Sequence, residues 1–121
     1  MGTGKTLTIP SREGFGKVFS KPDYKTSLGS FKLFGKKNSL SSHRIGVSIK
    51  KRDYRLATNR NLIKRKIRGS FLLSYQSLPP MDYVVLVRRG ISSDYEQLKL
   101  DLLSLWKKTK RDCEEDSNSN N

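Results

Sequence analysis

The sequence predicts an α+β fold, in which helices pack on a small mixed β-sheet. Its 121 residues, 34% of them hydrophobic, are enough for one domain with a modest core. Short stretches alternate apolar and polar residues as strands do, and longer stretches repeat their apolar residues at the helical period of 3.6. Along the chain these stretches give helix, two or three strands, helix, strand and helix. This order is typical of α+β proteins.

The first half is predicted to hold a short helix and two strands. Residues 1–10 are expected to form a flexible N-terminus. Ser11 is a candidate N-cap for a helix that ends near Ser20, and a polar connection follows over residues 21–29. The side of this helix that can pack on a sheet carries Phe15, Val18 and Phe19.

Residues 30–34 and 43–49 alternate in the manner of strands. In the first, Phe31 and Leu33 are predicted to point inward. In the second, one face carries Ile45, Val47 and Ile49. The other face carries Arg44, Gly46 and Ser48, with Lys50 just beyond. Small residues flanked by cations predict a shallow, positively charged surface on which a ligand could lie.

The stretch from Arg55 to Phe71 predicts a basic amphipathic helix, with Thr58 or Asn59 as its N-cap. Its apolar stripe comprises Ile63, Ile67 and Phe71. Arg60, Lys64 and Arg68 repeat the same spacing on another side, with Asn61 and Arg65 beside them. Cations in the first turn oppose the helix dipole, so we expect their charge to serve a polyanion.

Charge is concentrated around this helix. Between Arg44 and Arg68 there are ten cations and one anion, Asp53, so this region supplies 10 − 1 = +9 of the formal net charge of +14. A solvated helix face is the ordinary explanation of a charge run. A field this dense attracts phosphate and releases counterions on binding, which favours nucleic acid as the partner over an acidic membrane surface.

The C-terminal part is predicted to contain a buried strand and a helix. Residues 82–87 are apolar and β-branched, as in a strand covered on both sides. Residues 93–96 form a capping box that opens a helix. Its apolar face is expected to comprise Tyr95, Leu98, Leu102, Leu105 and Trp106. Residues 112–121, acidic and then rich in Ser and Asn, are expected to be a disordered tail.

Composition excludes several kinds of site. Cys113 and His43 are the only residues of their types, which rules out an internal disulfide, a cysteine zinc cluster and the usual catalytic triads. We therefore expect neither catalytic residues nor a metal site in the protein. No apolar run approaches the roughly 20 residues that span a bilayer. With no signal peptide visible either, the sequence predicts a cytoplasmic protein.

Three stretches, in order, resemble the protein subunit of bacterial ribonuclease P. HRIGVSIKK resembles that family's strand R-x-G-x-S-x-x-K-K, and ATNRNLIKRKIRGSF resembles its basic helix A-V-x-R-N-R-x-K-R-x-x-R-E-x-F. DYVVLVRRG then resembles D-Y-V-V-x-x-R-x-G. The similarity spans about residues 11–110. Two positions depart from the pattern: Leu62 stands at the third position of Arg-Asn-Arg, and Gly69 where Glu is common.

The resemblance implies one RNA-binding domain over residues 11–111, with a left-handed βαβ crossover. In this family a large RNA holds the active-site magnesium ions and removes the 5′ leader of precursor tRNA. The protein is then an enzyme subunit that binds no cofactor itself. Its partners are expected to be the ribonuclease P RNA and precursor tRNA, with no membrane and no DNA.

The resemblance also assigns residues to two surfaces. The surface for the catalytic RNA comprises Arg60, Asn61, Lys64, Arg65 and Arg68. The cleft for the leader comprises Phe15, Phe19, Phe34, Ser48 and Lys51. Aromatic rings offer stacking surfaces to single-stranded bases while cations follow the phosphates. Leu62 is expected to remove one cation from the surface that meets the catalytic RNA.

Two other functions are compatible with the composition. One is a non-enzymatic basic RNA-binding protein, for example one associated with the ribosome; the ordered motifs favour the ribonuclease P subunit over it. The other is a DNA-binding protein whose basic helix enters a major groove. That function requires a helix-turn-helix partner before Arg60, where the sequence predicts a strand.

Overall fold

The computed structural model describes residues 7–9, 13–38, 42–89 and 95–119, without side chains for Leu7 and residues 115–119. In chain order the elements are β1 (Leu7–Thr8), α1 (Gly16–Ser20), β2 (Tyr24–Leu28), β3 (Phe31–Lys36), β4 (Arg44–Ile49), α2 (Ala57–Ser74), the 3-10 turn η1 (Tyr75–Ser77), β5 (Asp82–Val87) and α3 (Tyr95–Ser119). The α+β class is confirmed.

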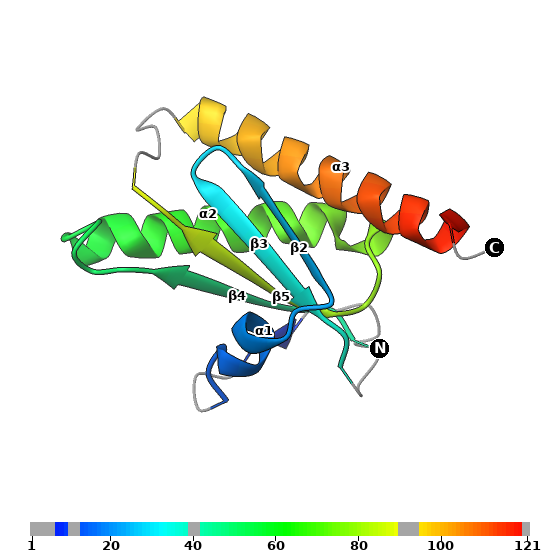
Figure 1. Cartoon of the computed structure of the whole chain (residues 1–121). Helices are drawn as coiled ribbons and strands as arrows, with labels where there is room; N and C mark the ends of the chain where they lie inside the picture. The colour runs from blue at the N-terminus through cyan, green and yellow to red at the C-terminus, as the bar shows by residue number, and fades with distance from the viewer. Residues whose placement is uncertain (1–6, 10–12, 39–41, 90–94, 120–121) are drawn as a thin grey trace, which may run out of the picture.

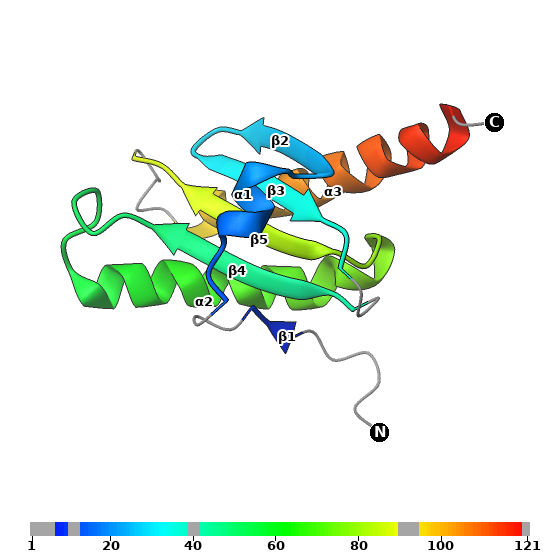
Figure 2. The ribbon, with the colours of Figure 1, turned by 60° about the horizontal axis from the view of Figure 1, so that its bottom comes forward.

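The strands form one five-stranded sheet in the order β1-β4-β5-β3-β2. β4 is parallel to both of its neighbours, β1 and β5, whereas the β3 pairings with β5 and β2 are antiparallel. The parallel strands β4 and β5 are joined through α2, and this crossover is left-handed (Figure 2). Most such crossovers are right-handed.

The two long helices cover one face of the sheet, and α1 lies on the other (Figures 1 and 2). The main core lies between the sheet and the long helices, where Ile67, Phe71 and Tyr83 have no exposed surface. Phe31 and Leu33 point into this core, as predicted. A smaller cluster of Ile9, Val18 and Val84 lies under α1. Because β5 is central and covered on both faces, its side chains are apolar almost throughout.

Two strands were not predicted. β1 lies within the expected flexible N-terminus and pairs with β4 through two residues, too few for a periodic signal. β2 lies within the expected polar connection. It is an edge strand that pairs with β3, and only its half-buried Tyr24 and Leu28 pack against the main core.

The N-terminal ends of α2 and α1 differ from expectation, whereas α1 ends at Ser20 as predicted. α2 begins at Ala57 with Leu56 as its N-cap, and no side chain caps it, so the predicted cap at Thr58 or Asn59 is wrong. α1 spans only Gly16–Ser20, and the proposed cap Ser11 lies outside the described residues.

The last helix continues past Arg111 to Ser119, through most of the segment expected to be a disordered tail. The Tyr24 hydroxyl on β2 donates a 2.8 Å hydrogen bond to the Asp112 carboxylate, and Lys108 Nζ donates to the Ser27 carbonyl at 3.1 Å. These contacts with an edge strand support helix where composition alone predicts disorder. Residues 93 and 94 of the proposed capping box lie outside the described residues.

Candidate nucleic-acid interface

One flank of α2 carries the predicted cations. Successive residues of an α-helix are rotated by about 100°, so the buried stripe of Ile63, Ile67 and Phe71 fixes the direction of every other side chain. Arg60, Lys64 and Arg68 follow next to this stripe, and Asn61 and Arg65 lie further toward solvent. In the described part of the chain, none of these cations forms an ion pair with a carboxylate. The helix therefore presents an uncompensated positive flank.

Arg60 also has a structural role. Its Nη1 donates hydrogen bonds to the carbonyls of Tyr54 and Arg55, at 2.8 and 3.0 Å. These carbonyls precede the helix, so the guanidinium fixes the segment that leads into it. This contact explains how a first-turn cation is tolerated at a helix N-terminus.

Arg68 has the opposite environment. Its Nε is buried and has no hydrogen-bond partner among the described residues, although the residue as a whole is partly exposed. Unsatisfied buried donors are rare in folded proteins. Because this Nε is buried, an acceptor from outside the chain would have to meet the terminal amino groups of the guanidinium, which have no carboxylate partner among the described residues.

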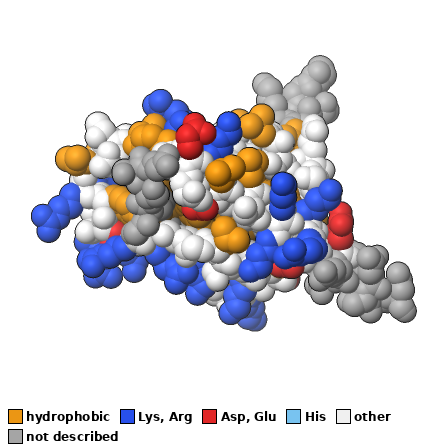
Figure 3. Space-filling model, turned by 90° about the horizontal axis from the view of Figure 1, so that it is seen from above, with side chains coloured by type: hydrophobic (Ala, Val, Ile, Leu, Met, Phe, Trp, Pro, Cys, Tyr) orange, Lys and Arg blue, Asp and Glu red, His pale blue; other side chains and the backbone are white. Residues whose placement is uncertain are grey.

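Leu62 lies on a different flank of the helix. Two residues before Lys64, it is rotated from it by about 160°, and it lines a groove of about 620 Å³ between α2 and α3, together with Gly69, Leu73 and Tyr95. Figure 3, which views the molecule from the side of α3, shows hydrophobic side chains exposed among Lys and Arg side chains. Both departures from the family pattern thus lie in this groove. Leu62 is outside the row of Arg60, Lys64 and Arg68, but Arg65 of the predicted RNA surface lines the same groove. The expectation that Leu62 removes one cation from that surface stays a prediction.

The sheet face under α1 is ordered in three rows across β4, β5 and β3. The strand register places Arg44, Asp82 and Lys36 in the first row. It places Gly46, Val84 and Phe34 in the second, and Ser48, Leu86 and Lys32 in the third. α1 lies over the second row, since its Val18 is buried against Val84. Two rows are therefore left on opposite sides of α1.

The three predicted aromatic residues gather at the second row. Phe19 meets Phe34 edge to face, with ring centroids 5.0 Å apart, and Phe15 lies 6.3 Å from Phe19. Phe15 lies against the β4 backbone: a Cβ added to Gly46 would come within 2.4 Å of its Cε1. The Phe19 side chain remains 38% exposed, so an aromatic surface faces solvent beside α1.

The third row forms the floor beside these rings. Ser48 lies there as predicted, half-buried, and Lys51 follows in the exposed turn after β4. Lys32 was not among the predicted residues, yet its Nζ lies 5.6 Å from the centre of the Phe34 ring. The signal was present in the sequence, because Lys32 and Phe34 are two residues apart and share a face of the strand.

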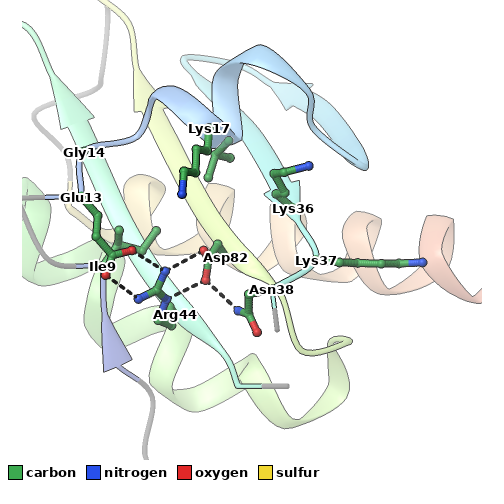
Figure 4. Close-up of a pocket in the computed structure, with 10 residues that line it drawn as sticks. Ile9, Glu13, Gly14, Lys17, Lys36, Lys37, Asn38, Arg44 and Asp82 are labelled. Atoms are coloured by element: carbon green, nitrogen blue, oxygen red, sulfur yellow. Dashed lines mark hydrogen bonds and ion pairs between the residues drawn. The ribbon is translucent and has the colours of Figure 1, made fainter. Parts of the chain in front are cut away.

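The first row is neutralised internally (Figure 4). Arg44 is buried, with 9% of its surface exposed, and its guanidinium donates to Asp82 through Nε at 2.7 Å and Nη2 at 2.8 Å. It also donates to the carboxylate of Glu13, at 2.9 and 3.2 Å. Hydrogen bonds to Asp82 and Glu13 raise the pKa of Arg44 above its usual value. The expectation that Arg44 contributes to an open cationic surface is wrong.

Asp82 is held as a carboxylate. Burial acts to raise its pKa, but hydrogen bonds from Arg44 and Asn38 outweigh burial, and the pKa is lowered below its usual value. The Asn38 amide donates to Asp82 at 2.7 Å. The groove beside this row, of about 340 Å³, thus contains a fully engaged ion pair, with Lys17 and Lys37 at its rim.

The described side chains offer few candidates for catalysis or metal binding. Within the described ranges, no three His, Cys, Asp or Glu side chains cluster in a way that could hold a metal ion. His43 packs edge-on against Tyr75, and its Nε2 hydrogen-bonds to the Leu78 carbonyl. In the same ranges no helix combines the length and apolar character needed to cross a membrane.

Comparison with known proteins gives one consistent result. The family model described as Ribonuclease P matches residues 4–110. The ribonuclease P protein component of Photorhabdus laumondii is 38% identical over 105 residues, which cover 86% of this chain and 87% of that protein. The component of Idiomarina loihiensis is 34% identical over 113 residues, which cover 93% and 90%.

Solved structures of ribonuclease P proteins share the fold of this chain. The RNase P protein from Thermotoga maritima superposes with a TM-score of 0.70 at 26% identity, covering 84% of this chain and 96% of that one. The Staphylococcus aureus RNase P protein, at 24% identity, shares the fold with a TM-score of 0.72, covering 85% and 94% of the two chains.

Proposed function

The chain belongs to the ribonuclease P protein family, and we propose that its own part in the enzyme is to bind and orient two RNAs. It is the protein component of ribonuclease P, the endoribonuclease that matures the 5′ ends of tRNA. One surface, the cationic flank of α2, binds the catalytic RNA. The other, the aromatic surface formed by α1 and the third row of the sheet, which we call the leader cleft, binds the single-stranded 5′ leader.

The donor chemistry of the chain supports assigning cleavage to the RNA. Magnesium prefers carboxylate and phosphate oxygens, and the two carboxylates at the first row of the sheet face, Glu13 and Asp82, are both engaged by Arg44. The described residues therefore do not fit a magnesium site. In this proposal the ribonuclease P RNA holds the magnesium ions, and no step of cleavage passes through a protein side chain.

The flank of α2 supports binding of a folded RNA. Arg65, Lys64 and Arg68 are separated by about one helical turn or less, and none has a carboxylate partner within the described residues. Each cation that contacts a phosphate releases counterions, so binding weakens as salt increases. Asn61 lies beside these cations, where its amide can reach a phosphate or a 2′-hydroxyl.

The single observation that carries leader binding is the exposed aromatic surface beside a polar floor. Phe19 and Phe34 offer ring faces and edges for stacking, and Ser48 is small enough to leave the floor open. Lys32 and Lys51 lie beside these rings, where they could bind the phosphates of a leader whose bases stack there. Stacking depends little on base identity. Such a cleft suits an enzyme whose precursors differ in leader sequence.

The proposal is tested by a cleavage assay. Purified protein is added to a bacterial ribonuclease P RNA and a precursor tRNA, at a magnesium concentration too low for the RNA alone. We expect the protein to restore release of the 5′ leader. RNA binding without any stimulation of cleavage would instead indicate a non-enzymatic RNA-binding protein.

A second assay separates the two surfaces. The holoenzyme is titrated with precursor tRNA and with the same tRNA lacking its leader. Tighter binding of the leader-bearing RNA is expected if the cleft holds the leader. Equal affinities would remove the cleft from the proposal and leave only the α2 surface.

A further inference from the structure

α1 is too short to hold its own position. It has five residues, no side-chain cap, and Val18 as its only buried residue. A helix of this length is not stable in isolation. Its place over the second row must therefore be fixed by contacts from neighbouring segments, and the leader cleft depends on that place because Phe15 and Phe19 belong to α1 and its N-cap.

The strongest described contact at the start of α1 is the ion pair between Glu13 and Arg44. It is bidentate, with Nη2 to Oε1 at 2.9 Å and Nη1 to Oε2 at 3.2 Å. Paired bonds of this kind fix orientation as well as distance. Arg44 is in turn held by two bonds to Asp82 on the neighbouring strand. The carboxylate of Glu13 is thus tied to the sheet through a guanidinium that cannot move freely (Figure 4).

The chain then turns directly from Glu13 to Phe15. Gly14 between them has φ 66°, a left-handed conformation that favours glycine. Phe15 packs on Gly46, where no side chain intervenes. The positions of three consecutive residues are therefore fixed: Glu13 by an ion pair, Gly14 by its left-handed backbone conformation, and Phe15 by the contact of its ring with the β4 backbone.

We infer that Arg44 and Glu13 are positioning residues of the leader cleft: the ion pair between them holds the entrance to α1 so that Phe15 lies over Gly46. This inference rests on the proposed leader binding. Arg44 does not contact the RNA itself, because both edges of its guanidinium are already occupied. Arg44 instead helps to hold α1 in place, so that the aromatic rings face the third row on one side of α1 while the ion-paired first row lies on the other side.

The test uses Glu13→Ala in the reconstituted holoenzyme. Removing Arg44 would leave Asp82 buried without its partner and could prevent folding, whereas the Glu13 side chain is 47% exposed and can be changed more safely. We expect the ratio of affinities for leader-bearing and leaderless tRNA to fall about tenfold in this variant, which is the size of one weakened stacking contact. Its kcat with saturating precursor should stay unchanged. Glu13→Asp should restore part of the preference.

The matched control is Glu114→Ala. It removes the same charge from an exposed residue of α3, whose ion pair with Lys110 is long, at 4.0 Å between Nζ and Oε1. This variant should keep the wild-type preference. If Glu13→Ala lowered affinity for both tRNAs equally, or matched Glu114→Ala, net charge and not position would explain the effect, and the inference would fail.

A second variant reaches the same ring by another route. Gly46→Ala places a Cβ where Phe15 lies and must displace the ring. If the ion pair acts by positioning Phe15, Glu13→Ala and Gly46→Ala should each reduce the preference for leader-bearing tRNA. The fold-loss of this preference in the double variant should then be smaller than the product of the fold-losses in the two single variants. Fully multiplicative effects would overturn the inference. Absence of leader preference in the wild-type enzyme would instead contradict the proposed function of the cleft.

Discussion

Arg44 and Arg68 are residues of the same type in two different environments. Arg44 is buried and donates to two carboxylates, so its charge is neutralised within the fold. Arg68 is partly exposed and has no carboxylate partner among the described residues, so its charge is not neutralised within the fold. A guanidinium forms strong, oriented bonds to phosphate only when its donors are free. At the scale of single residues, hydrogen-bonding partners and not charge decide which cations are available to RNA.

Arg68→Ala is therefore expected to weaken binding of the ribonuclease P RNA and to reduce the slope of log K against log salt by about 1, as does the loss of one phosphate contact. Arg65→Ala should behave similarly. The measurement is RNA affinity between about 50 and 200 mM salt. Leu62→Ala, on the α3 side of the same helix, serves as the control and should leave the slope unchanged. Wild-type slopes for both arginine variants would remove this flank from the interface.

At the scale of elements, α3 depends on β2 for its second half. The hydrogen bond from the Tyr24 hydroxyl to Asp112 joins two segments 88 residues apart. Burial, together with this bond, raises the pKa of Tyr24 to about 12. The ordinary tyrosine value is 10, so between these pH values the folded state keeps a proton that the unfolded state has lost. The contribution of Tyr24 to stability is thus complete below pH 10 and declines as pH rises toward 12.

Tyr24→Phe is expected to lower the free energy of unfolding by about 1 kcal/mol at neutral pH, the value of one hydrogen bond. It should also flatten the loss of stability above pH 10. Denaturant unfolding of both proteins at pH 8 and pH 11 measures this difference. Tyr95→Phe, at a half-exposed ring, is the control and should follow the wild type. Parallel pH profiles for wild type and Tyr24→Phe would show that the hydroxyl does not link the two elements.

At the scale of the whole molecule, one aromatic cluster joins the sheet to both long helices. Phe71 of α2 lies 5.5 Å from the Tyr83 ring of β5 and 5.4 Å from the Trp106 ring of α3. All three residues are buried. The two proposed RNA surfaces lie outside this cluster, one on the far face of the sheet and one on the flank of α2. Their relative placement therefore depends on the core between them.

Phe71→Ala is expected to destabilise the protein by about 3–5 kcal/mol, as large-to-small changes at buried aromatic residues do. Equilibrium unfolding in urea measures the loss. Leu73→Ala, two residues away on the same helix but 82% exposed, should change stability by no more than about 0.5 kcal/mol. Similar losses in the two variants would contradict a core centred on Phe71.

The sequence by itself determined the elements whose signal is local. Alternation predicted the inward side chains of β3, and a continuous apolar run predicted the doubly covered β5. The 3.6-residue period predicted the buried stripe of α2. The ordered motifs pointed to the family that the comparisons identify. These features depend on residues within a few positions of one another, so a linear pattern carries them.

Only the tertiary structure decided the features that depend on distant partners. Arg44 is neutralised by Glu13 and Asp82, which lie 31 and 38 residues away in sequence. β1 and β2 are edge strands recognised by their backbone pairing, and α3 continues past Arg111 where Asp112 is hydrogen-bonded to β2. The proposed leader site likewise requires α1, Gly46 and Phe34 to meet. Pairing between distant segments depends on how the sheet is ordered, and no local pattern of residues encodes that order.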